Sequence, residues 1–299
     1  SGFANMAKNI DGFQGSGYVN SADTVIGFQG SGFVNLSDSL SGFQAAGFIN
    51  VSGPIQGFQA AGFINVSDNV DGFQAAGAIN VSDSVDGTQV AGAINVADNV
   101  SGNQITSLLN IGGAVEGLQI GVINISDSCD YPIGLINYSS NGRINGSLWI
   151  DETGMEIFTF VTGGKNLFTV FNLGEKVISN ESIVLFGIGY GYRYDWTKFY
   201  SETDLSWNAL FKPPSNKEDG KEEMNWENFN TLYRLKSSLG MKLGPYISLF
   251  AGISVNVLVT ELDVDPLAEP IGKLYLNSPA YGNDYYRWPG AFLGIKVGI

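Results

Sequence analysis

The sequence predicts an all-β protein with an N-terminal β-solenoid of 15-residue coils and a C-terminal eight-stranded antiparallel β-barrel. Two observations predict this fold class. A glycine recurs every 15 residues from Gly12 to Gly117, and after residue 142 the repeat gives way to segments of alternating apolar and polar residues. We therefore expect two domains, a solenoid over 1–141 and a barrel over 142–299.

Each repeat carries the same two amides at the same places. A glutamine follows the repeat glycine by two residues, and in most repeats an asparagine follows that glutamine by six. Identical side chains on neighbouring coils, about 4.8 Å apart, can form hydrogen-bonded ladders. We take these ladders as candidate interaction surfaces. Their members are Gln14, Gln29, Gln44, Gln59, Gln74, Gln89, Asn20, Asn35, Asn50, Asn65, Asn80 and Asn95.

The composition of the repeat favours strands and turns. Two glycines per repeat disfavour a helix, since each costs about 1 kcal/mol relative to alanine. The β-branched Ile64 and Val66 suit a strand, and the polar segment 67–69 suits a turn. Alternation places one set of residues on a common strand face, which we expect to form the core. This expected core set is Phe58, Ala60, Gly62, Ile64, Val66 and Val70.

An alternative architecture makes each repeat one antiparallel strand and turn of a larger barrel. The solenoid is favoured because such a barrel has no need for identical amides at every step. The repeat also changes along the chain: Thr88 and Asn103 replace one of its phenylalanines, and Ala78 and Ala93 replace the other. We expect the cross-section or the outer surface of the solenoid to change near residue 78.

The segment Gly117 to Asn124 reads Gly-Leu-Gln-Ile-Gly-Val-Ile-Asn. It resembles the units of a bacterial surface-repeat family built on Gly-hydrophobic-Gln-x-Gly-hydrophobic-x-Asn, and the resemblance covers about residues 1–138. It implies an envelope protein of Gram-negative bacteria without a defined biochemical activity. Most repeats of this chain depart from the family pattern by one additional residue between glutamine and glycine.

The second half of the chain contains eight segments with strand-like alternation. In the sixth, Tyr233 and Leu235 fall on the opposite face from Arg234 and Lys236. Alternation of this kind is typical of strands whose two faces meet different surroundings. The expected strands are 143–151, 155–163, 166–174, 182–195, 198–211, 230–244, 246–260 and 287–299.

Alternation alone does not decide which face points into the barrel. A soluble lipocalin-like barrel encloses its apolar face, whereas a membrane barrel exposes it. The membrane arrangement is favoured because the polar face is rich in glycine, serine and charges of both signs, and because aromatic residues gather near strand ends. Long links over 212–229 and 261–286 alternate with short ones, as in such barrels. The expected interior charges are Glu202, Asp204, Arg234, Lys236, Lys242 and Lys296.

Residues 143–299 resemble the eight-stranded OmpA-like outer-membrane barrels, on the strength of 187–193 and the alternating terminal segment 292–299. The resemblance implies an anchor, because side chains fill a barrel of this size. Ile299 stands where these barrels usually end in an aromatic residue, which leaves recognition by the insertion machinery open. The even strand count and the position of the long links place the solenoid in the periplasm, while the surface-repeat resemblance suggests the cell surface.

The composition removes most catalytic arrangements. The chain has no histidine and one cysteine, Cys129, so neither a Ser-His-Asp triad nor a site of His or Cys metal ligands can form. Glu202 and Asp204 could form a glycosidase-like pair, but we expect them to pair with lysines instead. A column of aspartates could bind Ca²⁺ between coils, but each member is expected to cap a turn. That column is Asp23, Asp38, Asp68, Asp83, Asp98 and Asp127.

The expected function is a non-catalytic one. Residues 1–142 contain 11 acids and the single base Lys8, a balance that repels nucleic acid. We expect an outer-membrane-anchored structural protein without a cofactor, whose partners are outer-membrane lipid and a protein of the cell envelope, within a larger complex. The alternatives are a glycan-binding adhesin and a soluble secreted protein whose barrel holds an apolar ligand.

Overall fold

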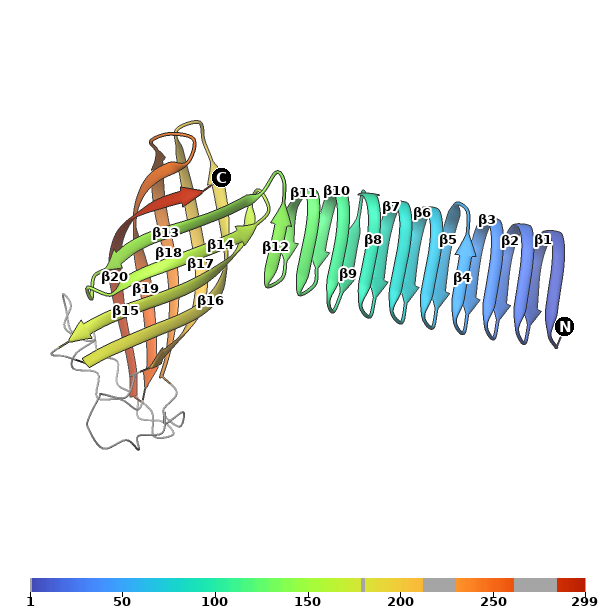
Figure 1. Ribbon diagram of the computed structural model, residues 1–299, viewed down its shortest axis with the longest axis horizontal. Helices are drawn as coiled ribbons and strands as arrows, with labels where there is room; N and C mark the ends of the chain where they lie inside the picture. Colours follow the sequence, from blue (N-terminus) through green and yellow to red (C-terminus); the bar gives the residue numbers. More distant parts are fainter. Residues whose placement is uncertain (1, 179–180, 212–229, 261–283, 299) are drawn as a thin grey trace. The chain divides into compact units, whose positions relative to one another are not determined.

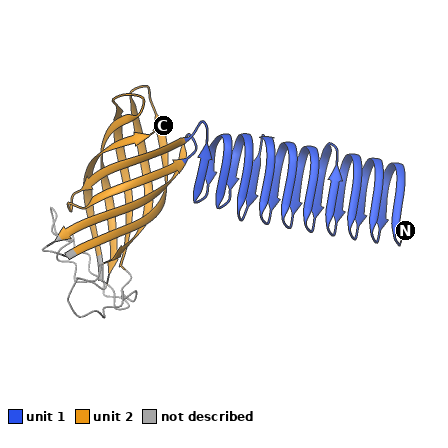
Figure 2. Cartoon of the chain, viewed as in Figure 1, with its two compact units in different colours: residues 1–142, 163–165 blue, residues 143–162, 166–299 orange. Residues whose placement is uncertain are grey.

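The computed structural model describes residues 2–178, 181–211, 230–260 and 284–298. Two compact units divide the chain, one comprising 1–142 with 163–165 and the other 143–162 with 166–299 (Figure 2). The first unit is a β-solenoid and the second a closed eight-stranded β-barrel, so the predicted fold class is confirmed. Within the described residues, no helix is long and apolar enough to cross a bilayer.

The strands of the solenoid pair in parallel, 15 residues apart up to the strand that begins at Leu109 and 13 or 14 residues apart in the last two pairs (Figure 1). Asn20 pairs with Asn35, and Gly27 pairs with Gly42. This parallel pairing contradicts the alternative of antiparallel repeats within a larger barrel. The strands are β1 (Ala4–Ser16), β2 (Val19–Ser31), β3 (Val34–Ala46), β4 (Ile49–Ser52), β5 (Ile55–Ala61), β6 (Ile64–Ala76), β7 (Ile79–Ala91), β8 (Ile94–Val100), β9 (Asn103–Thr106), β10 (Leu109–Ile120), β11 (Ile123–Ile133) and β12 (Ile136–Ser139).

The repeat glycine is needed for two physical reasons. Its φ angle is positive, +123° at Gly27 and +133° at Gly42, a conformation that other residues rarely adopt. The coils also approach closely there, so that a Cβ atom on Gly42 would lie 2.1 Å from the carbonyl oxygen of Gly27. The 15-residue glycine period therefore marks the corner at which the coil turns.

The inside and outside of the solenoid are reversed relative to the expected core set. Val70 is buried as predicted, but Phe58, Ile64 and Val66 lie on the outer side and are only half-buried. Gln59 and Asn65 are fully buried in their place. The physical reason is that an amide in this stack satisfies its hydrogen bonds within the narrow coil, whereas a phenylalanine ring can still stack on its neighbours from outside.

A column of aliphatic side chains accompanies the amides inside the solenoid. It contains Val25, Leu40, Ile55, Val70, Val85, Val100 and Val115, and Cys129 occupies the same place in the last full coil. The phenylalanines lost beyond residue 73 belong to columns on the outer side, stacked with ring centroids about 5 Å apart. The predicted change near residue 78 is therefore a change of the outer surface.

Eight antiparallel strands close the barrel, with β13 paired to β20. Every predicted strand of this half is present, with ends shifted by a few residues. The strands are β13 (Arg143–Asp151), β14 (Glu156–Gly163), β15 (Leu167–Ile178), β16 (Glu181–Asp195), β17 (Phe199–Phe211), β18 (Asn230–Lys242), β19 (Ile247–Thr260) and β20 (Asp284–Gly298). The expected long link 212–229, most of the link 261–286, and Ile299 lie outside the described residues.

The barrel turns its apolar face outward. Leu239 and Ile253 are 66% and 69% exposed, whereas Arg234 on a neighbouring inward position is 3% exposed. The interior also contains an apolar cluster, in which Phe250 packs against Phe292 beside Trp149. Phe250 breaks the alternation of its strand in the sequence because it belongs to this cluster.

Candidate functional site

The amide columns form continuous hydrogen-bonded ladders. Asn80 Nδ2 donates to Asn95 Oδ1 of the next coil over 3.0 Å. It also donates to the carbonyl oxygen of Val90, on the opposite side of its own coil, over 2.8 Å. Gln89 Nε2 donates to Gln74 Oε1 over 2.8 Å. Both ladders were expected as interaction surfaces, but their members are buried and hydrogen-bonded, and a partner cannot reach them. Their role is to hold the coils together.

The two ladders donate in opposite directions along the stack. Each asparagine donates to the asparagine of the following coil, as Asn65 does to Asn80. Each glutamine donates to that of the preceding coil, as Gln74 does to Gln59. Consecutive hydrogen bonds in a ladder polarise and strengthen one another. Because the two ladders run in opposite directions, both are strengthened while their dipoles cancel. The solenoid therefore contains two polarised ladders whose combined dipole is small.

On one outer face of the solenoid, two adjacent columns of stacked residues carry apolar side chains in every coil from Val34 to Tyr138. We call it the Ile/Val face. Its residues are in register from coil to coil, as Ile64 with Ile79 and Val66 with Val81. No polar or charged side chain except the Tyr138 hydroxyl occurs in these columns. They comprise Val34, Ile49, Ile64, Ile79, Ile94, Leu109, Ile123 and Ile136, and beside them Leu36, Val51, Val66, Val81, Val96, Ile111, Ile125 and Tyr138.

A second outer face carries stacked phenylalanines, and aliphatic residues appear on it where the phenylalanines are replaced. A methyl group on Gly30 would lie 2.6 Å from the ring of Phe28, so the ring covers the small residue beside it. Where Thr88 replaces phenylalanine, the residue two positions later is Val90. The same exchange gives Asn103 with Ile105. Bulky aliphatic residues thus appear where the rings are lost.

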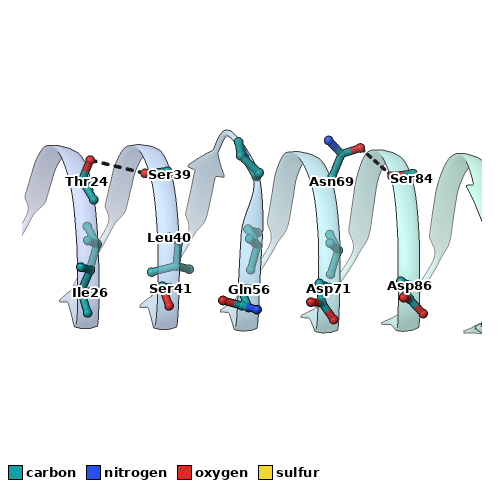
Figure 3. Close-up of a pocket in the computed structure, with 14 residues that line it drawn as sticks. Thr24, Ile26, Ser39, Leu40, Ser41, Gln56, Asn69, Asp71, Ser84 and Asp86 are labelled. Carbon is teal, nitrogen blue, oxygen red and sulfur yellow. Dashed lines mark hydrogen bonds between the residues drawn. The ribbon is translucent and has the colours of Figure 1, made fainter.

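The third outer face is polar and acidic. A shallow trough of about 510 Å³ crosses several coils there (Figure 3). Figure 3 shows its two walls as rows of side chains, with Asp71 and Asp86 at one end. The aspartates considered for Ca²⁺ are exposed near this face, and among the described residues no three acidic, Cys or His groups come together to hold a metal ion. The rows contain Thr24, Ser39, Asn69 and Ser84, and opposite them Ile26, Ser41, Gln56, Asp71 and Asp86.

The charges predicted for the barrel interior form ion pairs there, with one exception. Glu202 accepts a hydrogen bond of 3.0 Å from Arg193 and contacts Lys296, while Asp204 lies 3.5 Å from Lys236. All of these groups are buried. Lys242 differs, because it is one-third exposed at the end of its strand and pairs with Asp195 at 2.9 Å.

The sequence analysis did not name Asp151, Arg193 and Arg143 among the interior charges. Asp151 pairs with Arg234 over 2.7 Å, Arg193 packs over the ring of Tyr200 at 3.6 Å from the centroid, and Arg143 lies 3.5 Å from Asp195. These three residues occupy inward positions of their strands, so strand alternation could have placed them inside. Their specific partners depend on how the strands align around the closed barrel, which alternation does not give.

The arrangement around Glu202 and Asp204 supports structural pairing over acid-base chemistry. The space left beside these two carboxylates amounts to about 10 Å³, bordered also by Lys236 and Lys296. A water molecule needs at least that much room, and a sugar ring needs far more. Each carboxylate therefore lies in an ion pair, as expected: Glu202 with Arg193 and Lys296, and Asp204 with Lys236.

Comparison of the chain with protein-family models, with curated proteins and with solved structures finds no match. The surface-repeat and OmpA-like resemblances stay predictions.

Cys129 is expected to be unreactive in the folded protein. Burial raises the pKa of its thiol from 9.0 to about 11. Thiolate at pH 8 is thus about 100-fold scarcer than in the unfolded chain, and a maleimide or disulfide reagent should label the native protein slowly. Rapid labelling without denaturant would contradict this burial.

The same pKa shift predicts a pH dependence of solenoid stability. The folded state binds the thiol proton more tightly than the unfolded state does. This proton therefore contributes fully to the free energy of unfolding below pH 9, and the contribution is lost as the pH rises toward 11. Cys129→Val, which continues the aliphatic column of Val115, should remove this alkaline loss. Urea unfolding at pH 8 and 10, followed by far-UV circular dichroism, measures the difference.

Proposed function

We propose that the barrel anchors the protein in a bacterial outer membrane and that the solenoid is a non-catalytic scaffold for a protein of the cell envelope. The observation that carries the anchor is the direction of the barrel faces. Aliphatic and aromatic residues such as Leu205, Leu235 and Leu293 point outward, and the ions lie inside. Exposed apolar area of this extent is costly in water and favourable in hydrocarbon.

The filling of the barrel supports an anchor rather than a pore or a ligand-binding barrel. Ion pairs line the interior between its two rims, with Lys236 and Asp204 near the middle of their strands and the other pairs closer to strand ends. The apolar cluster that includes Leu210, Leu232 and Leu258 fills it near the rim from which the long connections leave. A barrel that carries an apolar ligand needs an enclosed apolar cavity, and the interior space beside the ion pairs is about 10 Å³.

The strand connections support a periplasmic location of the solenoid. Asn145 pairs with Gly298, so the first and last strands of the barrel begin and end at the same rim. At that rim the described turns are short, for example between Lys242 and Ile247. Short turns face the periplasm in outer-membrane barrels. The chain enters the barrel from the solenoid at this rim.

Membrane fractionation combined with a heat-modifiability gel tests the anchor. The full chain, expressed with an export signal in a Gram-negative host, should remain in the membrane pellet after a carbonate wash. In detergent it should migrate as a compact species that shifts only on boiling, because closed barrels resist unfolding. Complete release by carbonate, or detergent-free solubility of the folded chain, would overturn the anchor.

A charge placed on the outer barrel face should separate the membrane barrel from a soluble one. Leu235→Lys puts a charge in the middle of β18, where it is expected to cost about 2–4 kcal/mol in a bilayer. The matched Leu243→Lys lies one residue past the end of this strand, where the side chain is exposed, and should have a small effect. The readout is the fraction of heat-modifiable protein in the membrane, and equal yields for both variants would indicate that water surrounds this face.

A further inference from the structure

We propose that the Ile/Val face of the solenoid is covered by the same face of a second copy of this chain. The inference deepens the scaffold part of the proposed function and rests on it, since it names the partner. The pairing of the two faces itself needs no anchor, and a shared membrane would strengthen it. The starting observation is that this face is apolar along the stack, whereas the phenylalanine face includes the polar Thr88 and Asn103 and the third face includes columns of acids.

The Ile/Val face is unlike a surface that meets water. Half-buried or exposed aliphatic side chains stand in register through eight coils, with Tyr138 as the one member that has a polar group. Leu36, Ile111 and Ile125 are among the members most exposed to solvent. Free soluble surfaces seldom contain contiguous apolar patches above a few hundred Å². A face of this kind is typical of one that another surface covers.

The period of the face argues for a second solenoid as its cover. Side chains of one column recur at the strand spacing of about 4.8 Å, so the face consists of parallel ridges along its whole length. Only a partner with the same spacing keeps its ridges between these ridges over eight coils. A second copy has that spacing by construction, and two flat sheets pack face to face at about 10 Å.

The area of the face is sufficient for association. Eight coils at about 4.8 Å per coil extend roughly 38 Å, and the four-residue stretch that carries the face in each coil, such as 64–67, is about 13 Å wide. Pairing two such faces buries roughly 500 Å² on each copy, about 1,000 Å² in total, which is the lower bound for specific interfaces. The geometry therefore points to a dimer of modest affinity, helped by the shared membrane.

The charges of the solenoid are compatible with this pairing. Asp68 and Asp83 lie in a column beyond the Ile/Val face, and Asp71 and Asp86 lie further along the coil. In a dimer whose two stacks run in the same direction, the two-fold axis puts the Asp68 column of each copy at opposite edges of the interface, so carboxylates do not face one another. The remaining repulsion acts at longer range and is screened by salt. A dimer of this type should be favoured by increasing salt, whereas a basic partner on the acidic face would be released by it.

Cysteine crosslinking in isolated membranes tests the proposal with the full chain. The background is Cys129→Val, so that each variant contains one thiol. Val51→Cys, Val66→Cys and Val96→Cys probe the Ile/Val face, and Asp68→Cys and Asp98→Cys are matched controls two residues further along the coils of Val66 and Val96. After oxidation with copper phenanthroline, we expect a disulfide-linked dimer from one or more face variants, at a yield at least fivefold above the controls.

A charged variant shows whether the apolar contact is responsible. Adding Val81→Lys to the best crosslinking variant should reduce the dimer at least fivefold, with heat-modifiability of the barrel unchanged. No crosslink at any face position, equal crosslinking of the Asp controls, or insensitivity to Val81→Lys would overturn the second copy as the cover. Failure of the anchor would appear separately, as release of all variants by carbonate.

Discussion

Asn80→Asp should lower the free energy of unfolding of the solenoid by about 4 kcal/mol, because it leaves buried acceptors unpaired and introduces a buried charge. Asn80 is fully buried, and its amide nitrogen donates to Asn95 and to the carbonyl group of Val90. An aspartate of nearly the same shape cannot donate to either oxygen. In a stack whose coils contact only their neighbours, a break in the middle also separates the two halves.

Asn99→Asp is the matched control for this experiment. Asn99 follows the ladder residue Asn95 by four residues in β8 and is exposed, so the same chemical change there should cost less than about 0.5 kcal/mol. All five tryptophans lie in residues 143–299. Tryptophan fluorescence therefore reports the barrel and far-UV circular dichroism reports both units. A urea midpoint of the solenoid unchanged by Asn80→Asp would contradict the structural role of the ladder.

The repeat period predicted the solenoid well but not which side of each strand is inside. Period alone establishes that Gln59 stacks on Gln74, since equivalent residues meet in any coil of constant length. The choice between faces was made on hydrophobicity, which favoured Phe58 over Gln59 as a core residue. That choice failed because a ladder satisfies buried amides so completely that the usual cost of burying them disappears. The exposed Ile/Val face follows from the same reversal.

In the barrel, the apolar-polar alternation predicted the faces of the strands correctly. Side chains alternate strictly between the two faces of a strand, so one well-placed residue determines the face of all the others. Arg234 and Lys236 were placed inside for this reason. Lys242 was placed with them, but it lies where the strand ends and the interior opens. The ion partners were predicted only as a class, because pairs such as Arg234 with Asp151 join strands distant in sequence. The closing of the barrel determines those pairs.

Glu202→Gln should destabilise the barrel by about 3–5 kcal/mol, the usual cost of removing one partner from a buried ion network. The Glu202 carboxylate serves two cations at once, Arg193 at 3.0 Å and Lys296 on its other oxygen. A glutamine keeps the size of the side chain but leaves both cations undercompensated in an interior with almost no room for water. The measurement is the urea midpoint of tryptophan fluorescence in detergent, together with the temperature at which the compact gel species disappears.

Glu175→Gln provides the matched control, since Glu175 is exposed on β15 and its carboxylate accepts a hydrogen bond from Ser182 at the surface. It should change the midpoint little. The double variant Glu202→Gln with Lys296→Met removes one cation along with the anion and should recover part of the loss, as coupled partners do in a double-mutant cycle. Lys296→Met alone completes the cycle: if the losses of the two single variants add up to the loss of the double variant, the two side chains are not energetically coupled. The barrel interior would then owe its stability to the apolar cluster around Trp149 and Phe292 rather than to its ions.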